Sequence, residues 1–436
     1  MRSQKRRGAS SRFRGAQIKR DRGLTTIMLS IITGVLLIHT AAHAGGPAFT
    51  RIVAPAETAQ TAYTNPAAMT RLKNPMLTGQ LILGSSFSDF QVDDSRTTNT
   101  GGDPRSPTPV VVPSVYYVRP LFSERWRLGL TLNAPGGFGA QSGPNWAGRY
   151  YNDESSLIFI AGTMSVAYRL TPWLSLGSGL SIQYTSSKSK TQVVNPGAGD
   201  PDAKLKTKAD GVGVGFIASA LVELSPQTRF GIVWHSETNP DEKPEVRLRG
   251  STLPPAIVDA INRAGRDIDT TLRTPQHVDM GLYHSWGEGW SATIDVIWVD
   301  FSRFGLTEFR VEGQSLAAPN SKFQDFWITT AGFEFPLFSN LPKLKGRVGA
   351  MYITQPVSDN DRTFSFALDR AWGLGAGVTY LRESGSLIDL NLTMLKSGDG
   401  SIDTGEASAS EPRGRVAGKD DKPWSLALEF TYHFAF

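Results

Sequence analysis

Apolar and polar residues alternate with a period of two along much of this 436-residue chain. The last such segment, WSLALEFTYHFAF at 424–436, places its leucine and aromatic side chains on one face of a strand and its small or polar side chains on the other. One strand of this kind fits a soluble β-sandwich equally well. The fold class must therefore be inferred from how often the pattern repeats along the chain. The pattern predicts fourteen strands, at 76–92, 109–120, 125–134, 156–170, 173–187, 208–224, 228–236, 275–286, 289–301, 325–337, 345–355, 369–381, 386–396 and 424–436.

The connections between these segments alternate between short and long. Short links contain the sequences LFSE, TP, SPQ, GE, FSNLPKL and ES, which are rich in turn-forming residues. The links between them are long and polar, at 135–155, 188–207, 237–274, 302–324 and 397–423. This alternation is typical of an outer-membrane β-barrel with short periplasmic turns and long external loops. The chain is therefore predicted to be all-β, a 14-stranded antiparallel transmembrane barrel.

The faces of the strands support a barrel. In segment 156–170, Ile158, Met164 and Val166 share one face, and Thr163 and Ser165 share the other. Several aromatic residues lie beside the short-turn ends, where amphipathic rings suit the lipid headgroup layer: Tyr168, Trp173, Trp286, Trp290, Tyr380 and Phe434. Because an unpaired strand edge is too costly in hydrocarbon, the last strand must pair with the first.

The N-terminus has the pattern of a secretory signal peptide. Residues 1–23 carry nine Lys or Arg and one acid, followed by the apolar run LTTIMLSIITGVLLI and by Ala42-His43-Ala44. Cleavage after residue 44 is expected, and a retained N-terminal anchor is the alternative. Without these residues, 36 basic and 39 acidic residues remain, so the net charge changes from +5 to −3. A nucleic-acid partner is therefore not predicted.

Candidate catalytic chemistry is sparse. The chain has no cysteine, no H-E-x-x-H, no P-loop and no G-x-S-x-G motif. We predict no enzyme activity, no cofactor and no metal site, and we interpret His277 and His433 as hydrogen-bonded residues of the lumen. A general diffusion porin and, less well supported, a barrel enzyme acting on lipid are the alternatives.

Residues 45–75 precede the first strand and show no alternation. Asn65 followed by Pro66 and Ala67 is typical of a helix start, because Asn caps a backbone donor and Pro needs no hydrogen at the first helical position. We predict a hatch inside the barrel here, with a surface turn as the alternative, and the barrel itself at 76–436. Elsewhere, 252–272 has helical spacing through Ile268, and 398–422 is interpreted as a solvated loop.

Several stretches resemble the FadL family of outer-membrane transporters of long-chain fatty acids and other hydrophobic compounds. These are TNPAAMTRL near Asn65, NAPGGFG (133–139), AYRLTPWLSLGSGLSIQY (167–184), WVDFSRF (298–304) and LDRAWGLGAGVTY (368–380). The resemblance covers nearly all of the chain after residue 44. It implies a Gram-negative outer-membrane location, a 14-stranded barrel with an N-terminal hatch, and a passive, ligand-gated route for hydrophobic small molecules through an internal pocket and a side opening.

The same resemblance assigns candidate site residues. Pro135, Gly136 and Gly137 match the family's kink segment at the side opening and are expected where the third strand ends, with an ordinary loop start as the alternative. The candidate ligand contacts are Phe49, Lys188 and Lys190. The segment before Asn65 is short for the family, so hydrophobic transport is better supported than fatty-acid transport. Expected partners are outer-membrane lipid and, through the C-terminal strand, the barrel-assembly machinery, with the protein acting as a monomer.

Overall fold

The computed structural model describes residues 47–436, apart from residue 51, 106–108, residue 198, 317–321, 365–367 and 406–412. The predicted signal peptide at 1–44 lies outside the described residues.

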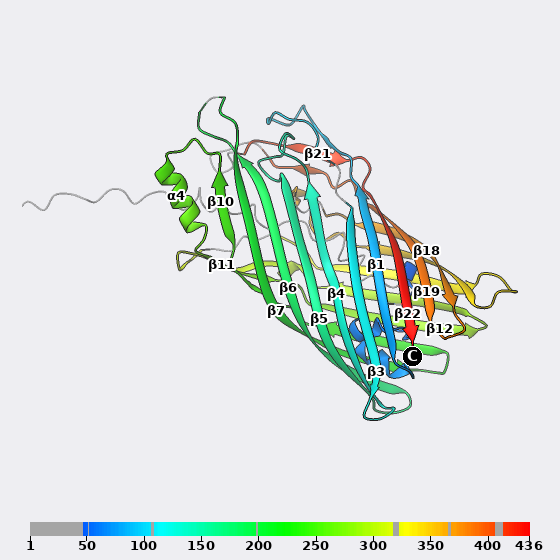
Figure 1. Cartoon of the computed structure of the whole chain (residues 1–436). Helices are drawn as coiled ribbons and strands as arrows, with labels where there is room; N and C mark the ends of the chain where they lie inside the picture. The colour runs from blue at the N-terminus through cyan, green and yellow to red at the C-terminus, as the bar shows by residue number, and fades with distance from the viewer. Residues whose placement is uncertain are drawn as a thin grey trace, which may run out of the picture.

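Fourteen long antiparallel strands form a closed barrel within the described part of the chain (Figure 1). They are β1 (Met76–Phe87), β3 (Val110–Leu121), β4 (Trp126–Gln141), β5 (Glu154–Arg169), β6 (Leu174–Val193), β7 (Ala203–Glu223), β8 (Thr228–His235), β12 (His277–Gly287), β13 (Trp290–Val299), β16 (Phe326–Pro336), β17 (Leu344–Ile353), β18 (Ala371–Leu381), β19 (Leu387–Ser397) and β22 (Trp424–Ala435). The predicted closure is confirmed: β22 pairs with β1 along its whole length, from Met76 opposite Ala435 to Phe87 opposite Trp424.

Short turns join β3–β4, β5–β6, β7–β8, β12–β13, β16–β17 and β18–β19, as predicted, and the other connections are longer. Two strand boundaries differ from the prediction. The first strand ends at Phe87, because the next short strand, β2 (Phe90–Val92), leaves the barrel and joins a separate sheet. Strands β6 and β7 extend further than expected and pair with each other up to Val193 and Ala203, which shortens the loop between them.

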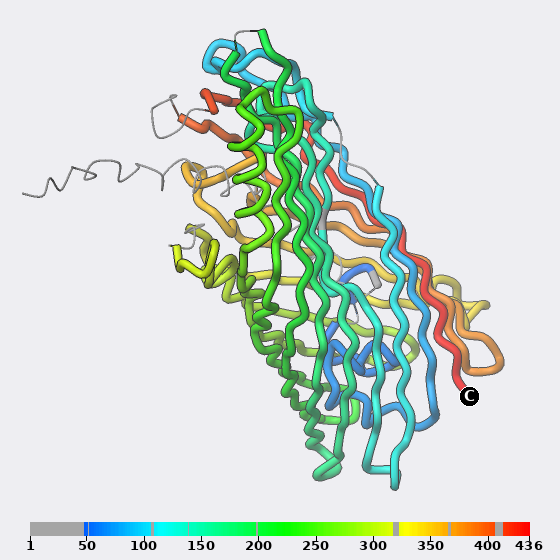
Figure 2. Tube along the Cα trace, turned by 60° about the vertical axis from the view of Figure 1, so that its left-hand side comes forward, coloured from blue at the N-terminus to red at the C-terminus, as the bar shows by residue number. Residues whose placement is uncertain are grey.

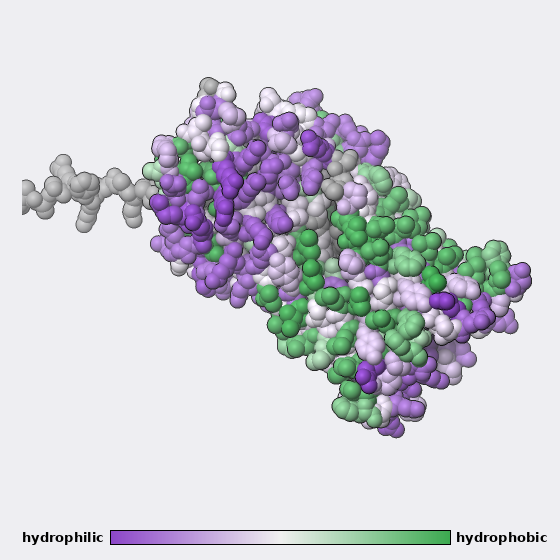
Figure 3. Space-filling view, viewed as in Figure 1, coloured by the Kyte–Doolittle hydropathy of each residue, from purple (hydrophilic) through white to green (hydrophobic). Residues whose placement is uncertain are grey.

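The outer face of the barrel is apolar. Ile158, Met164 and Val166 are exposed on β5, whereas Thr163 and Ser165 are buried inside, as the alternation predicts. Apolar residues gather over the lower part of the molecule and polar residues over the upper part (Figure 3). Trp173, Trp286, Trp290, Tyr380 and Phe434 are all exposed beside the short turns. Among the described residues, no helix combines the length and apolarity needed to cross a membrane.

Replacing Leu428 with Arg is expected to lower the free energy of unfolding by about 2–4 kcal/mol, because this exposed side chain points to the lipid near the middle of β22. Urea-induced unfolding in lipid vesicles would measure it. The control is Ala427→Arg, whose side chain points the other way and should cost less. Ala167, which the alternation also places inside, is not a suitable control, because it is buried against the hatch. A larger effect for Ala427→Arg would show that the register is wrong.

Additional strands extend the wall at the long-loop end, and two helices lie in the same connections. They are β9 (Asp241–Glu242), β10 (Glu245–Arg249), α4 (Pro255–Ala264), β11 (Ile268–Arg273), η4 (Phe301–Arg303), β14 (Gly305–Val311) and β15 (Gln314–Ser315). The predicted helix at 252–272 is confirmed only in its first part. Ile268 lies in β11, because its side chain packs with Leu205, Leu248 and Phe309 in a small apolar cluster between strands.

A three-stranded sheet of β2, β21 (Ala417–Asp420) and β20 (Ile402–Asp403) lies at the mouth of the barrel. The interpretation of 398–422 as a solvated loop was therefore wrong for its two strands, which lack hydrophobic periodicity and pair with a distant segment. Arg415 forms an ion pair with Asp403 (2.7 Å), and its hydrogen bond lowers the pKa of Asp403. Stabilisation by this pair is lost as the pH falls through that lowered pKa.

The N-terminal segment lies inside the barrel in the half that carries the short turns (Figures 1 and 2). It forms η2 (Pro47–Phe49), the single helical turn α3 (Thr61–Thr64) and the 3-10 helix η3 (Pro66–Arg71). We call residues 47–75, apart from residue 51, the hatch, which is the described part of the predicted segment 45–75. Its η3 contacts β5, β6 and β7, and its η2 contacts β17, β18 and β19, so the segment reaches across the lumen.

Candidate functional site

The Asn65-Pro66 pair stands at the start of η3, as the sequence predicts, with Pro66 in the first turn. The expected capping bond is not made, however. The Asn65 side chain instead donates from Nδ2 to the carbonyl oxygen of Val53 (3.0 Å) and is fully buried. Asn65 therefore connects two arms of the hatch. The sequence pattern could not reveal this, because the competing acceptor lies twelve residues away.

Polar contacts attach the hatch to the wall on several sides. Three wall arginines donate to four of its carbonyl oxygens: Arg127 Nε to Leu72 (2.7 Å), Arg169 Nη2 to Thr70 (2.9 Å), and Arg229 to Ala54 (Nε, 3.2 Å) and Pro55 (Nη2, 2.8 Å). The Ser165 hydroxyl donates to the Ala62 carbonyl oxygen (2.7 Å), and the Ala67 amide donates to Ser219 Oγ (2.9 Å). These bonds pair backbone groups of an irregular segment that is shielded from water.

Glycines on the inner face of the wall allow the hatch backbone to approach closely. A methyl group at Gly349 would lie 2.1 Å from the carbonyl oxygen of Ala48, and one at Gly177 would lie 2.3 Å from the amide nitrogen of Ala67. Gly332, Gly349 and Gly375 are direct neighbours on β16, β17 and β18, so together they form a flat surface under η2. This fit requires residues without a side chain.

The tip of the hatch belongs to a large apolar cluster in the lumen. Phe49, Ile52 and Val53 pack there with buried side chains from the wall and from the loops that fold inward. The wall and loop members are Leu157, Phe159, Ile217, Val233, Leu272, Ile297, Val299, Phe301, Phe304, Phe323, Phe326, Ile328, Met351, Ile353, Val357, Ala371 and Leu395. A membrane barrel usually has a polar lumen, so an apolar interior of this extent is suited to an apolar ligand.

Aromatic rings from the β13–β16 connection and from the start of β16 form one side of this cluster. The rings of Phe301 and Phe304 are stacked 5.0 Å apart, and Phe323 and Phe326 lie 4.8 and 5.4 Å from Phe301. Such pairs add to the free energy of apolar burial. Period-two alternation did not identify Phe301 and Phe304 as site residues, although both lie in the quoted stretch WVDFSRF.

The wall between β3 and β4 contains a discontinuity. The two strands pair from Leu121 opposite Trp126 to Val115 opposite Leu132, and their ladder ends there although both strands continue. Just beyond this point, the pairing of β4 with β5 shifts between Asn133 and Gly136, which is a β-bulge.

Pro135, Gly136 and Gly137 lie in this discontinuity, within β4 rather than at its end. The expectation that the strand stops here was wrong, because β4 continues along β5 to Gln141 after the bulge. Pro135 has no backbone N–H to offer to β3. A methyl group at Gly137 would lie 2.9 Å from the carbonyl oxygen of Leu157, so glycine is required at that position.

The candidate ligand contacts do not all come together. Phe49 is 3% exposed and lies in the apolar cluster. Lys188 and Lys190 lie near the long-loop end of β6, on the face that also carries the exposed Ile182 and Tyr184. Lys190 Nζ pairs with Asp153 (3.0 Å), and neither lysine belongs to the apolar cluster. Both lysines point away from the lumen, because even-numbered residues of β6 face outward.

Proteins of known identity are similar to this chain in sequence. The chain is 23% identical over 405 residues to the long-chain fatty acid transport protein of Escherichia coli O6:H1, covering 85% of this chain and 87% of that protein. It is 22% identical over 400 residues to outer membrane protein P1 of Haemophilus influenzae Rd, covering 80% and 83%.

Two solved structures have the same fold. A Pseudomonas aeruginosa FadL homologue matches with a TM-score of 0.73 at 17% identity, over 93% of this chain and 99% of that one. The toluene transporter TodX of P. putida matches with a TM-score of 0.63 at 15% identity, over 91% and 98%. The family model described as outer membrane protein transport protein (OMPP1/FadL/TodX) matches residues 30–434. The chain therefore belongs to the OMPP1/FadL/TodX family and is a transport protein of the Gram-negative outer membrane.

Proposed function

We propose that the protein carries hydrophobic small molecules passively across the outer membrane, by way of the apolar cluster in its lumen. The observation that carries this proposal is the composition of that cluster, which joins Phe49, Ile52 and Val53 of the hatch to apolar side chains of the wall. A ligand that replaces part of these contacts would loosen the hatch tip, because the same side chains hold it. Binding and opening would then be coupled.

The proposed route has an entrance at the mouth and an exit through the side of the barrel. Phe90, Trp146 and Phe364 form an aromatic group at the mouth, with ring centroids 4.9 to 6.4 Å apart. The interrupted β3–β4 ladder is the proposed exit, because an apolar molecule leaving there enters the lipid and avoids water. The hatch blocks the straight path to the periplasm through its contacts with β5, β7 and β17.

The substrate class is proposed from chemistry and from the relatives. Those relatives are named as transporters of long-chain fatty acids and of toluene. Because Lys188 and Lys190 do not reach the apolar cluster, the chain offers no predicted carboxylate-binding group there, and we propose hydrophobic compounds as the broader class. Uptake of radiolabelled oleate and toluene by cells that lack their own transporter of this type tests the proposal. Uptake of neither compound above the vector control would contradict it.

The two rival functions predict different measurements. A general porin would give a large, steady ion current in a planar bilayer, whereas a barrel filled by the hatch and the apolar cluster should conduct little. A lipid-modifying enzyme would release products from an ester substrate in detergent. The named relatives are transport and outer-membrane proteins, and we propose that this chain is likewise not an enzyme. We also propose that it acts as a monomer, with β22 recognised by the barrel-assembly machinery.

A cross-link across the proposed exit is expected to stop most of the uptake. Ser114 on β3 and Asn133 on β4 directly follow the last ladder pair, Val115 and Leu132, and both point inward. The chain has no cysteine, so a Ser114→Cys, Asn133→Cys variant holds only the introduced pair. Oxidation to the disulfide should abolish most of the substrate uptake, and reduction with dithiothreitol should restore it.

The matched control is Tyr117→Cys, Leu130→Cys, a register pair within the intact part of the same ladder. Its oxidation joins strands that are already paired and should leave uptake unchanged. Equal uptake by the oxidised and reduced Ser114→Cys, Asn133→Cys protein, with the disulfide verified by mass spectrometry, would exclude the β3–β4 exit.

A further inference from the structure

Two histidines and an aspartate lie together on the inner wall of the barrel. His235 ends β8 and His277 begins β12, and the two residues are direct partners in the register of these strands. Asp279 lies two residues further along β12 and therefore points to the same side. All three side chains are buried.

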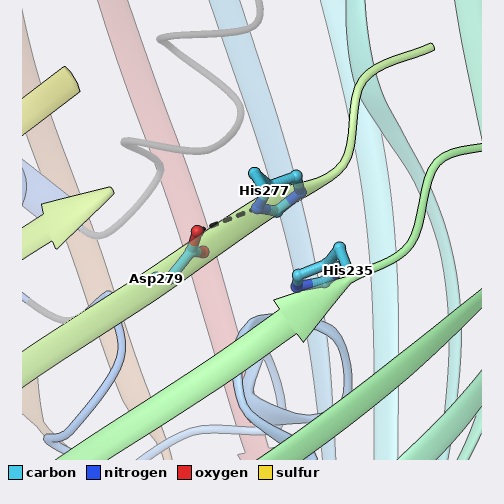
Figure 4. A group of neighbouring side chains, drawn as sticks. All are labelled: His235, His277 and Asp279. Atoms are coloured by element: carbon cyan, nitrogen blue, oxygen red, sulfur yellow. Dashed lines mark hydrogen bonds and ion pairs between the residues drawn. The ribbon is translucent and has the colours of Figure 1, made fainter. Parts of the chain in front are cut away.

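The polar atoms of this triad converge (Figure 4). His277 Nδ1 lies 2.8 Å from Asp279 Oδ1, which confirms the prediction of a hydrogen-bonded lumen histidine. The two imidazole rings are stacked with centroids 4.2 Å apart and an interplanar angle of 19°. One ligand atom from each of the three residues lies within 4.8 Å of the others.

The strand neighbours of the triad are apolar, and the buried carboxyl of Asp295 interacts electrostatically with Asp279. The residues opposite its members in the two neighbouring ladders are Ile217, Val233, Ile297 and Val299, all of them buried. From the lumen side, the ring of Tyr63 in the hatch lies 5.1 Å from the ring of His235. Polar groups are costly in such surroundings unless their interactions compensate. A bound ion would add one further interaction to those that these three side chains already make.

We propose that His235, His277 and Asp279 form a binding site for a divalent transition-metal ion of the Zn²⁺ type. Neutral imidazole and carboxylate are ordinary ligands of such ions, at about 2.0–2.2 Å. Ligand atoms around one tetrahedral ion are roughly 3.3 Å apart at these bond lengths, so the triad needs side-chain rotations that bring its atoms closer by about 1.5 Å. The ion would replace the contact between His277 and Asp279 and leave a position for water.

The site would act on the hatch. Both strands that supply ligands are neighbours in the wall, and Tyr63 of α3 packs on one ligand, His235. Metal binding fixes the orientation of that imidazole, and the Tyr63 ring rests against it. An ion in the triad would therefore stabilise the docked hatch by ordering its contact surface, independently of which substrate the barrel carries.

Zn²⁺ titration of the full-length protein, purified in detergent without a histidine tag and stripped with EDTA, tests the proposal. Isothermal titration calorimetry should detect one saturable site per chain. His235→Gln and His277→Gln should each weaken Zn²⁺ binding by roughly 100-fold or more, because removing a direct ligand exceeds the 10–100-fold loss typical of its supporting partners. Co²⁺ should give visible absorption bands that the same variants lose.

His284→Gln is the matched control, because His284 lies on the same strand and bonds to Thr228 (2.8 Å) away from the triad. It should bind Zn²⁺ as the unchanged protein does. Heat-modifiable migration on gels would verify that every variant is folded. No saturable binding, or equal binding by His235→Gln, His277→Gln and the unchanged protein, would overturn the proposal and leave the triad as a hydrogen-bonded group only.

Discussion

Replacing Gly349 with valine is expected to displace the tip of the hatch and to raise the ion leak through the barrel. Even the first carbon of the new side chain would lie 2.1 Å from the carbonyl oxygen of Ala48. That oxygen belongs to the backbone and cannot rotate away, and the neighbouring Gly332 and Gly375 hold the same hatch residues closely. Overpacking of this kind costs about 1–3 kcal/mol or more, and undocking the hatch relieves it.

Two measurements follow the displacement. Planar-bilayer conductance should increase, and a cysteine introduced by Phe49→Cys, at a position only 3% exposed, should become accessible to a polar maleimide. The control is Gly162→Val on β5, where an added carbon meets nothing within 4 Å. It should change neither reading. If Gly349→Val leaves the conductance unchanged and the cysteine of Phe49→Cys stays inaccessible to the maleimide, then the docking of η2 does not depend on the close contact at Gly349.

The barrel could be predicted from the sequence because every membrane-spanning strand must meet the same local requirements. A strand in lipid needs apolar residues on its outer face and satisfied backbone groups on both sides, so the alternation recurs from strand to strand and turn residues mark the short connections. The residues Ile158, Thr163 and Met164 illustrate how directly that pattern translates into exposure and burial. Closure of β22 on β1 then follows from the absence of any allowed edge.

The site was harder to predict because it depends on contacts between distant segments. Asn65 bonds to Val53 and makes no helix cap, and η2 meets glycines on β16, β17 and β18. Residue type and the resemblance to the family predicted an interruption at Pro135, but the continuation of β4 past it depends on pairing with β5. Aromatic residues of the inward-folding β13–β16 connection, such as Phe301, carry no period that distinguishes them from a surface loop.

The inward-facing glycines were nevertheless a usable signal. In AWGLGAGVTY, glycines occupy the alternate positions whose neighbours Trp372 and Leu374 point to lipid. Such a face has no side chains to fill the lumen, so something else must lie against it. The structure places Ala48 of the hatch against Gly375. A strand with glycines at its inward-facing positions therefore indicates a plug segment. This signal is independent of the resemblance of the motifs to a known family.

Replacing Asp389 with alanine is expected to be the most damaging single change to the stability of the barrel. Its two carboxylate oxygens accept from Arg347 Nη2 (2.8 Å) and contact His433 Nε2 (2.9 Å), and both partners are fully buried. His433 in turn lies 2.8 Å from Thr78 Oγ1, so the network runs across the seam where β22 meets β1. This confirms the prediction of His433 as a hydrogen-bonded lumen residue.

Removing the carboxylate breaks the buried ion pair between Asp389 and Arg347. Breaking such a pair typically costs about 3–5 kcal/mol. Urea titration of the barrel reconstituted in vesicles should show a loss of this size, and Asp389→Asn, which keeps the shape and part of the hydrogen bonding, should show less. The control is Glu383→Ala at the nearby turn, which breaks an exposed pair with Lys343 (3.1 Å) and should have no measurable effect. If Asp389→Ala unfolds at the same urea concentration as Glu383→Ala, water or rearrangement compensates for the lost carboxylate, and the network does not stabilise the seam.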